Sequence, residues 1–452
     1  MARVGKVRLE GDRLTDLMNI GVLTTRFPLD QVHEVLRATG KSSKRLRDLP
    51  AHVVVYYVVA LALYRAEGSR EVLRLLLEGL RAIVGLGVEV VPASKGAISR
   101  ARSRLGMEPV KELYDRIVGP VADERTQGAF YRGWHLVALD GFTLETPDTV
   151  ANEEAFGRPR SPSRGTSAYP LVLGVGLVEV GTHIVFGVVL GNYYTGEVTL
   201  AREVVPRLKR GMLCLADRYF PGFKLWEQAV GTGADLVWRV RSGIRFVEEE
   251  RLPDGSYRSR FPSRRKGAEM RVRVIEYKVK NQKGEDQDVR IITSILDWHL
   301  APADELAALY AQRWEFETAL DEFKTHLRGA RTVLRSQTPD LVRQEVYGLL
   351  LAHFALRGLM HEAAVHAGKD PDRISFVHTV RVARRTLPRF AALPPSGLEK
   401  PAPRRHRGDS SGGRRRAPTP TGEARGETKA EPLPGAEPKR HVQESQIYLG
   451  DC

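Results

Sequence analysis

The feature that most constrains the fold of this chain is an alternation of short apolar runs with helical patterns between residues 134 and 240. Two helical stretches, Glu197–Lys209 and Phe223–Val230, separate the later runs. The runs lie at Leu136–Leu139, Leu171–Val180, His183–Leu190, Met212–Ala216 and Leu236–Val240. Strands that alternate with helices predict an α/β domain with a mixed sheet.

The residues before this region are patterned as helices, with apolar periodicity over Asp30–Ala38, Ala51–Arg65 and Arg70–Ile83. We therefore expect an all-α N-terminal domain over residues 1–125. Its later part holds a short basic helix beside a turn, which is compatible with a DNA-reading helix-turn-helix or with a solvated basic face. The basic residues are Lys95, Arg100, Arg102 and Arg104.

The pattern changes after residue 240 to alternation typical of strands, with turn signals at Asp254-Gly255 and Lys283-Gly284. It predicts a β-rich insertion at about 242–300, inside a domain that spans residues 126–390. The alternating segments are Ile244–Val247, Met270–Val279 and Val289–Leu296. Helical patterns return at Pro302–Leu327, Pro339–Ala367 and Ser375–Arg385.

Residues 391–452 differ in kind from the rest of the chain. The segment from Pro394 to Cys452 holds 9 of the 26 prolines and several arginine runs, with almost no apolar periodicity. A segment of this composition cannot bury a core. We expect a disordered, basic, Pro-rich tail.

Charge and cysteine content narrow the class of protein. The net charge of +15 makes nucleic acid the leading candidate partner. Two cysteines, Cys214 in an apolar run and Cys452, cannot form a disulfide framework, which fits a reducing compartment. The longest apolar stretch, Val53–Tyr64, is shorter than the ~20 residues that cross a bilayer, and the N-terminus lacks a secretory pattern. We expect no membrane partner and a cytoplasmic, nucleoid-associated location.

Two aspartates close apolar runs, Asp140 after Leu136–Leu139 and Asp217 after Leu213–Ala216. In an open α/β sheet, ligands bind at the edge where such strands end. An acidic residue that closes a strand is also a common turn former, so neither aspartate alone identifies a site.

A third carboxylate lies on the helical stretch after Pro302. At 100° per residue, four polar side chains of this stretch fall within an arc of about 60°. They are Tyr310, Arg313, Glu317 and Lys324. An adjacent apolar stripe would dock the helix on the sheet. The alternative is an ion-pair lattice on a wet helix, and Asp321 competes with Glu317 for the acidic role.

The combination of these residues favours a metal site over isolated turn formers and ion pairs. Three carboxylates on separate elements of a basic α/β protein, Asp140, Asp217 and Glu317, suit two divalent cations, because Mg²⁺ prefers oxygen ligands. Phosphodiester chemistry is the natural use of such a site.

The spacing Tyr-x2-Arg-x3-Glu-x6-Lys at residues 310–324 resembles the signature of cut-and-paste transposases of insertion-sequence family four, in the DDE, RNase H-like superfamily. The resemblance covers roughly residues 12 to 390, and its second aspartate lies 100 residues before Glu317. Phe142 departs from it, because a small residue is common at that position in similar sequences. The other matching segments begin at Asp140, Pro147, Leu215, Trp238 and Arg343.

The resemblance implies an RNase H-like catalytic domain in which Asp140, Asp217 and Glu317 bind Mg²⁺ or Mn²⁺, with two ions expected. It implies that other signature residues hold DNA phosphates, namely Tyr310, Arg313 and Lys324. The implied partners are the terminal inverted repeats of an element, target DNA, and a second copy of the chain in a synaptic homodimer. The implied reaction cleaves element ends and joins their 3′ ends to target DNA.

Two other functions stay open, an RNase H-like nuclease without strand transfer and a non-catalytic DNA-binding regulator derived from a transposase. Similar enzymes often place a Trp against a flipped base, and Trp238 and Trp298 are candidates, although an aromatic residue in a strand or near a helix start is more often part of the core. Basic residues of the insertion fit a DNA-facing surface or a solvated loop, namely Arg258, Arg260, Arg264, Arg265 and Lys266. Three histidines lack metal-like spacing and are expected to pack or lie on the surface, namely His183, His326 and His353.

Overall fold

The structure is a computed structural model. It describes residue 23 and residues 26–43, 49–84, 93–161, 165–263, 269–280, 286–329, 332–390 and 448–449. The predicted turn at Lys283-Gly284 and the basic residues Arg264, Arg265 and Lys266 lie outside the described residues. So does most of the expected tail, of which only Tyr448–Leu449 is described, as strand β13 paired with β11.

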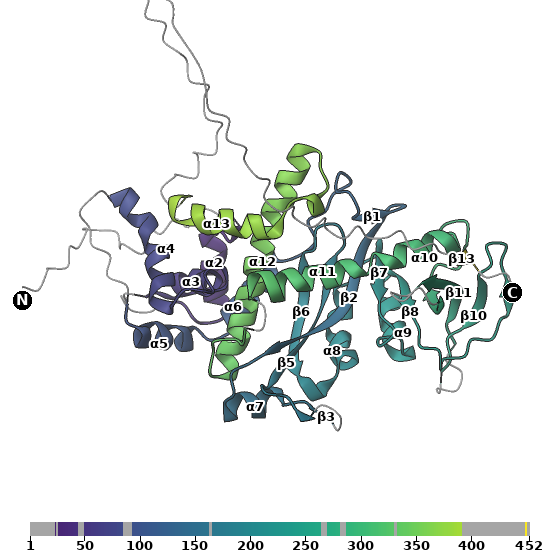
Figure 1. Cartoon of the computed structure of the whole chain (residues 1–452), viewed down its shortest axis with the longest axis horizontal. Coiled ribbons are helices and arrows are strands. Elements are labelled where there is room, and N and C mark those ends of the chain that lie inside the picture. The colour runs from purple at the N-terminus through teal and green to yellow at the C-terminus, as the bar shows by residue number, and fades with distance from the viewer. Residues whose placement is uncertain are drawn as a thin grey trace, which may run out of the picture.

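The predicted N-terminal helices are present, and they share a core with the C-terminal helices. α3 packs against α12 (Pro339–Ala367) and α4 packs against α13 (Phe376–Phe390) (Figure 1). α3 is apolar around its whole circumference, as a helix enclosed on all sides must be. The helices are α2 (Leu29–Ala38), α3 (Ala51–Leu63), α4 (Ser69–Val84), α5 (Lys95–Leu105) and α6 (Glu108–Ile117).

Five strands form the centre of a mixed sheet, in the order β6-β5-β2-β7-β8. β5 and β6 form an antiparallel meander with β2, whereas β7 and β8 run parallel to β2. This is the order of an RNase H-like domain, so the predicted fold class is confirmed. The strands are β2 (Trp134–Glu145), β5 (Leu171–Glu179), β6 (Val185–Asn192), β7 (Met212–Ala216) and β8 (Asp235–Arg239), and β1 (Phe130–Tyr131) pairs with β2.

Helices cover the sheet and fix its strand ends. α8 (Glu197–Val204) packs on β5 and β6, α9 (Phe223–Gly231) packs on β8, and α11 (Trp314–Asp321) packs on β2 (Figure 1). A smaller helix and a small hairpin lie beyond β2, namely α7 (Val150–Phe156), β3 (Arg160–Ser161) and β4 (Gly165–Thr166). Single turns flank α8 and α12, namely η1 (Tyr193–Thr195), η2 (Val205–Arg207) and η4 (Pro371–Arg373).

The predicted β-rich insertion continues the main sheet rather than forming a separate one, because β12 pairs antiparallel with β8. Its strands are β9 (Glu250–Arg251), β10 (Tyr257–Arg260), β11 (Arg271–Lys280) and β12 (Asp286–Thr293). The prediction of a strand at Ile244–Val247 is wrong, since these residues form a turn and an extended loop. Their alternation reflects packing of Phe246 against Phe261 and not strand pairing.

The helical stretch predicted from Pro302 to Leu327 is not one α-helix. α10 (Ala303–Ala311) ends at a turn over Gln312 and Arg313, and α11 follows it. α11 then passes into a π-helical turn, η3 (Glu322–Leu327). Because both interruptions change the rotation per residue, the angular positions expected for a continuous α-helix do not hold along the whole stretch.

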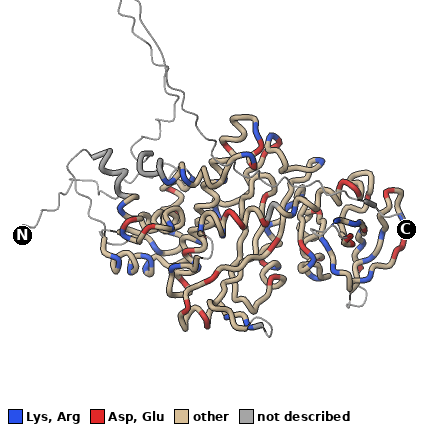
Figure 2. Tube along the Cα trace, viewed as in Figure 1, with Lys and Arg blue, Asp and Glu red and all other residues tan. Residues whose placement is uncertain are grey.

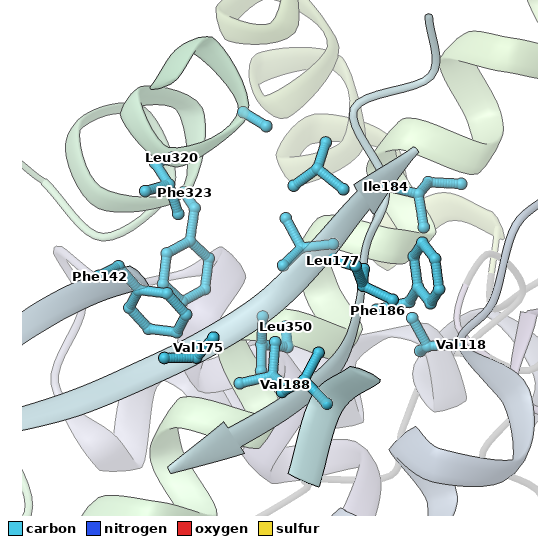
Figure 3. Packing of buried hydrophobic residues seen from close by; sticks show 14 of the residues in the cluster. Val118, Phe142, Val175, Leu177, Ile184, Phe186, Val188, Leu320, Phe323 and Leu350 are labelled. Atoms are coloured by element: carbon cyan, nitrogen blue, oxygen red, sulfur yellow. The ribbon is translucent and has the colours of Figure 1, made fainter. Parts of the chain in front are cut away.

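Phe142 fits the core beside Asp140 by compensation. Its ring is buried and packs edge-on against Phe323 of η3, with centroids 5.7 Å apart (Figure 3). On the neighbouring strand β5, a Cβ atom at Gly174 would clash with the Phe142 ring, lying 2.7 Å from its Cε2 atom and closer still to Cζ. Gly174 therefore provides the space that the larger aromatic side chain needs.

Among the described residues, no helix combines the length and apolar character needed to cross a bilayer.

Candidate active site

Asp140 and Asp217 lie side by side because of the strand register. Leu139 on β2 pairs with Ala216 on the parallel strand β7, so the next residue on each strand is one of the two aspartates. Neighbouring strands are about 4.8 Å apart and partnered residues point to the same face. The two carboxylates therefore lie side by side, although only Asp217 follows the end of its strand, whereas Asp140 lies inside β2, which continues to Glu145.

Arg313 connects Glu317 to this pair. Its guanidinium lies 3.1 Å from Oδ2 of Asp140 and 3.4 Å from Oε1 of Glu317. The arginine side chain is 10% exposed, whereas the Glu317 side chain is 48% exposed. Asp321, the competing carboxylate, is instead exposed and lies 3.3 Å from His326. The geometry thus favours Glu317 as the third carboxylate.

Asp140 lies in an environment that resists its ionisation. Burial raises its pKa to about 6, against the lowering effects of the Gly141 N–H, which donates to Oδ1 at 2.8 Å, and of Arg313. The charges of Glu197 and Asp217 also raise the pKa. A cation that binds among several neighbouring carboxylates stabilises their ionised forms and offsets the repulsion between them.

The remaining signature residues also lie at this edge. The Tyr310 hydroxyl is buried and donates to the carbonyl oxygen of Ala216 at 3.3 Å, which holds the end of β7. The Lys324 ammonium lies 6.0 Å from the centre of the Phe142 ring. Burial, with help from Arg328, lowers the Lys324 pKa, while carboxylates including Asp140 oppose that shift. Despite the two helix interruptions, all four residues of the signature lie around Asp140 and the end of β7.

Sequence reasoning missed a fourth carboxylate, Glu197, the first residue of α8. The charge of Glu197 acts on Asp140, and burial together with the charge of Asp217 raises the pKa of Glu197, while Lys324 lowers it. The only signal in the sequence was its position directly after a glycine at a helix start. That signal is too common to indicate a site.

The tryptophan candidates have different outcomes. Trp238 is fully buried and packs perpendicular to Trp226, so it belongs to the core. Trp298 is half-buried against His299. The exposed tryptophan at the site is Trp314, which is 60% exposed with the Arg313 guanidinium 5.6 Å from its ring centre. Its position next to Arg313 in the signature was the available clue.

A basic cavity of about 880 Å³ opens beside Asp217, between the end of β7 and the insertion. The Tyr219 ring is half-exposed there, and the guanidinium groups of Arg218 and Arg241 lie 5.3 and 4.7 Å from its centre. Other basic residues of its lining are Arg239, Arg251, Lys278 and Arg290. A cationic cavity with an aromatic surface suits a nucleic-acid backbone and its bases.

Several predicted basic residues have other partners. In the insertion, Arg258 pairs with Glu250 at 2.7 Å and Arg260 pairs with Glu249 at 2.5 Å. In α5, Arg102 donates to Gln344 at 2.9 Å and connects the N-terminal helices to α12. Lys95, Arg100 and Arg104 remain exposed on α5, and Figure 2 shows Lys and Arg there and across the insertion.

The donor chemistry of the site fits divalent cations. Asp140, Asp217 and Glu317 supply only carboxylate oxygens, the ligands that Mg²⁺ prefers. Within the described ranges, no three carboxylate, histidine or cysteine groups are already gathered around one point that would hold a metal ion. Because Mg²⁺ is usually bound by one or two carboxylates together with substrate phosphates, such gathering is not required before DNA binds.

Comparisons with known proteins agree on one family. Residues 17–115 match the model of the insertion element 4 transposase N-terminal region, and residues 135–355 match the transposase DDE domain. The chain is 29% identical over 371 residues to the transposase InsG for insertion sequence element IS4 of Escherichia coli, covering 79% of this chain and 80% of that protein. It is 27% identical over 194 residues to the putative transposase InsZ of the same organism, covering 43% and 62%. A piggyBac transposase synaptic complex with hairpin DNA aligns over 87% of this chain and 82% of that chain, at 14% identity and a TM-score of 0.43.

Proposed function

This chain belongs to the insertion element 4 transposases with a DDE domain, and from that premise we propose how its residues perform transposition. Enzymes of this family depend on divalent metal. We infer that Asp140, Asp217 and Glu317 hold the cations, that the cations are Mg²⁺ or Mn²⁺, and that two are bound. The substrate is double-stranded DNA at the ends of an insertion element, whose 3′ ends are then joined to target DNA.

The observation that carries this proposal is the strand register. It sets two aspartates from segments 77 residues apart at the same sheet edge, and the Arg313 guanidinium contacts both Asp140 and Glu317 there. Asp140, Asp217 and Glu317 would hold the cations, which would supply activation of water or of a 3′-OH and stabilisation of charge on the phosphorus.

The residues around the carboxylates position DNA. Arg313 is held by two carboxylates in this structure, and cation binding by those carboxylates frees its guanidinium for a phosphate. Lys324 lies close enough to Asp140 and Glu317 for their charges to act on it. We therefore assign it, like Arg313, to a phosphate of the DNA backbone. Tyr310 is the least exposed of the three, and we assign it the smallest share of phosphate binding. The exposed ring of Trp314 offers a base a stacking surface.

The DNA path extends from the carboxylates in two directions. The lining of the basic cavity around Tyr219 includes Arg218, the residue after Asp217. α5, which carries exposed cations, lies at the opposite end of the molecule from the insertion (Figure 1). We propose that α5 contributes to recognition of the terminal repeat and the cavity to the flanking strand. Because an element has two ends, one copy of the chain for each end predicts a homodimer when the ends are paired.

A strand-transfer assay separates this function from its two alternatives. The probe is the DNA that flanks the gene, first intact and then cut beforehand to leave a free 3′-OH, with a supercoiled plasmid as target in Mg²⁺. A transposase cuts the intact probe and joins the cut probe to the plasmid. Cutting without joining indicates a nuclease, and binding without cutting indicates a regulator. Either result contradicts the proposal.

A further inference from the structure

The side chain of Glu197 extends from the start of α8 and lies against β2 at Gly141. It is the first residue of α8, after Gly196, whose φ of +79° is in the left-handed region that glycine favours. A Cβ atom built at Gly141 would lie 2.6 Å from Cδ and 2.9 Å from Cγ of Glu197. The Glu197 side chain thus occupies the space that any side chain at position 141 would take, next to Asp140.

The charge of Lys324 favours the ionised form of Glu197, but the two side chains form no ion pair in the structure as described. In the described part of the chain, the Glu197 carboxylate makes neither a hydrogen bond nor an ion pair, although the side chain is half-buried. An acidic residue at a helix start gains from the helix dipole whichever way its side chain points. A solvent-facing rotamer would keep that gain and avoid repulsion from Asp140 and Asp217. Among the described residues, no hydrogen bond or ion pair thus fixes the side chain in this direction, and it stays beside the carboxylates of Asp140 and Asp217.

We propose that Glu197 is a fourth carboxylate ligand of the divalent-cation centre. The inference rests on the proposed function, because it assumes that cations bind Asp140 and Asp217. Because each Mg²⁺ is bound by one or two carboxylates together with waters and phosphates, a centre with two cations has room for a fourth carboxylate. Gly141 has a defined part in this arrangement, since its missing side chain lets Glu197 reach the strand end.

Binding of Mn²⁺ to the full chain without DNA tests the proposal directly. Titration calorimetry compares the wild type with Glu197→Gln, which removes the charge and keeps the volume. Glu203→Gln, an exposed glutamate on the same helix, is the matched control. We expect at least about a 10-fold loss of affinity for one of the two Mn²⁺ ions in Glu197→Gln and none in Glu203→Gln. Wild-type affinity and stoichiometry in Glu197→Gln would overturn the proposal.

A third variant separates this proposal from the proposed function. Asp140→Asn should lose Mn²⁺ binding if the carboxylate centre is correct. If Asp140→Asn loses binding and Glu197→Gln does not, only the role of Glu197 fails. If neither variant changes binding, the metal centre itself is misplaced. The melting temperature without metal checks folding, and it should not fall in Glu197→Gln, because removal of a like charge relieves repulsion. If Glu197→Gln folds poorly, Glu197→Asp serves as a second variant. Because it keeps the charge, Glu197→Asp should retain more Mn²⁺ affinity than Glu197→Gln.

Gly141→Ala tests the geometry independently. The added methyl group displaces the flexible end of Glu197, so this variant should weaken Mn²⁺ binding by a similar factor. The double variant Gly141→Ala/Glu197→Gln should be no weaker than either single variant, because both remove the same ligand. Fully additive losses would contradict a shared mechanism.

Discussion

Two glutamates of the signature segment, Glu317 and Glu322, are five residues apart and lie in opposite electrostatic environments. Glu322 is buried, with the Arg357 guanidinium donating to its Oε2 at 2.7 Å and to its Oε1 at 2.5 Å. His183 and His353 lie 3.7 and 3.6 Å from it. Although burial alone would raise the Glu322 pKa, His183, His353 and Arg357 together hold it well below its usual range.

Glu317 faces the opposite situation. It is half-exposed and shares one arginine with Asp140, whose own pKa is raised. The difference shows how one segment serves two purposes. The paired charge at Glu322 fixes the π-helical turn against α12, whereas the carboxylates beside Asp140 keep the negative charge that the proposed function assigns to cation binding. Stability and chemistry are thus separated along a few residues.

The largest expected effect is loss of catalysis without loss of structure. Asp140→Asn and Asp217→Asn should each reduce cutting of the flanking DNA by on the order of 10³-fold or more, because each removes a charged ligand at constant volume. DNA binding in a gel-shift assay should stay near the wild-type level. An active variant would remove that aspartate from the site.

The buried cluster should show the reverse behaviour. Arg357→Ala removes the guanidinium that donates two hydrogen bonds to the buried Glu322 and leaves only His183 and His353 beside its charge. It should lower the free energy of unfolding by about 3–5 kcal/mol, measured by denaturant titration. Arg343→Ala, a half-buried arginine on the same helix, is the control and should cost much less. An Arg357→Ala protein as stable as the control would show that the cluster does not anchor the signature segment.

The pH dependence of stability should come in part from Asp140. A carboxylate whose folded pKa is raised contributes stability below its unfolded pKa, near 4, and loses it as pH rises through about 6. In metal-free buffer, wild type should therefore lose about 3 kcal/mol relative to Asp140→Asn between pH 4 and pH 7. The exposed variant Asp321→Asn is the control. Parallel curves for wild type and Asp140→Asn would rule out this burial effect.

The smallest expected effects concern phosphate contacts. Arg313→Ala and Lys324→Ala should each flatten the salt dependence of binding to flanking DNA by roughly 0.9 units of log–log slope. Lys369→Ala, an exposed lysine beyond the end of α12, should leave the slope unchanged. If the two cations only pair with carboxylates, their removal would cost under about 1 kcal/mol of stability and would not alter the slope.

The apolar periodicity of the sequence predicted those helices and strands whose bounds depend on residues close together in the chain. β7 at Met212–Ala216 and α12 at Pro339–Ala367 have the predicted bounds, and Asp217 follows the end of β7 as expected. The prediction that a strand ends at Asp140 is wrong, because β2 continues to Glu145 through its pairing with β5. The break at Gln312–Arg313 was not predictable, because tertiary contacts at the sheet edge override helical periodicity there. Glu197 could not be found either, since its nearness to Gly141 depends on how α8 packs across the sheet.

The central claim is that Glu317 provides chemistry and Glu322 provides structure. Single-turnover cutting of the flanking DNA in Mg²⁺ and the melting temperature should be measured on the same preparations of Glu317→Gln and Glu322→Gln. We predict that Glu317→Gln loses cutting and keeps its melting temperature, whereas Glu322→Gln melts several degrees lower and still cuts at temperatures where it is folded. Normal cutting by Glu317→Gln, or an unchanged melting temperature in Glu322→Gln, would contradict the account.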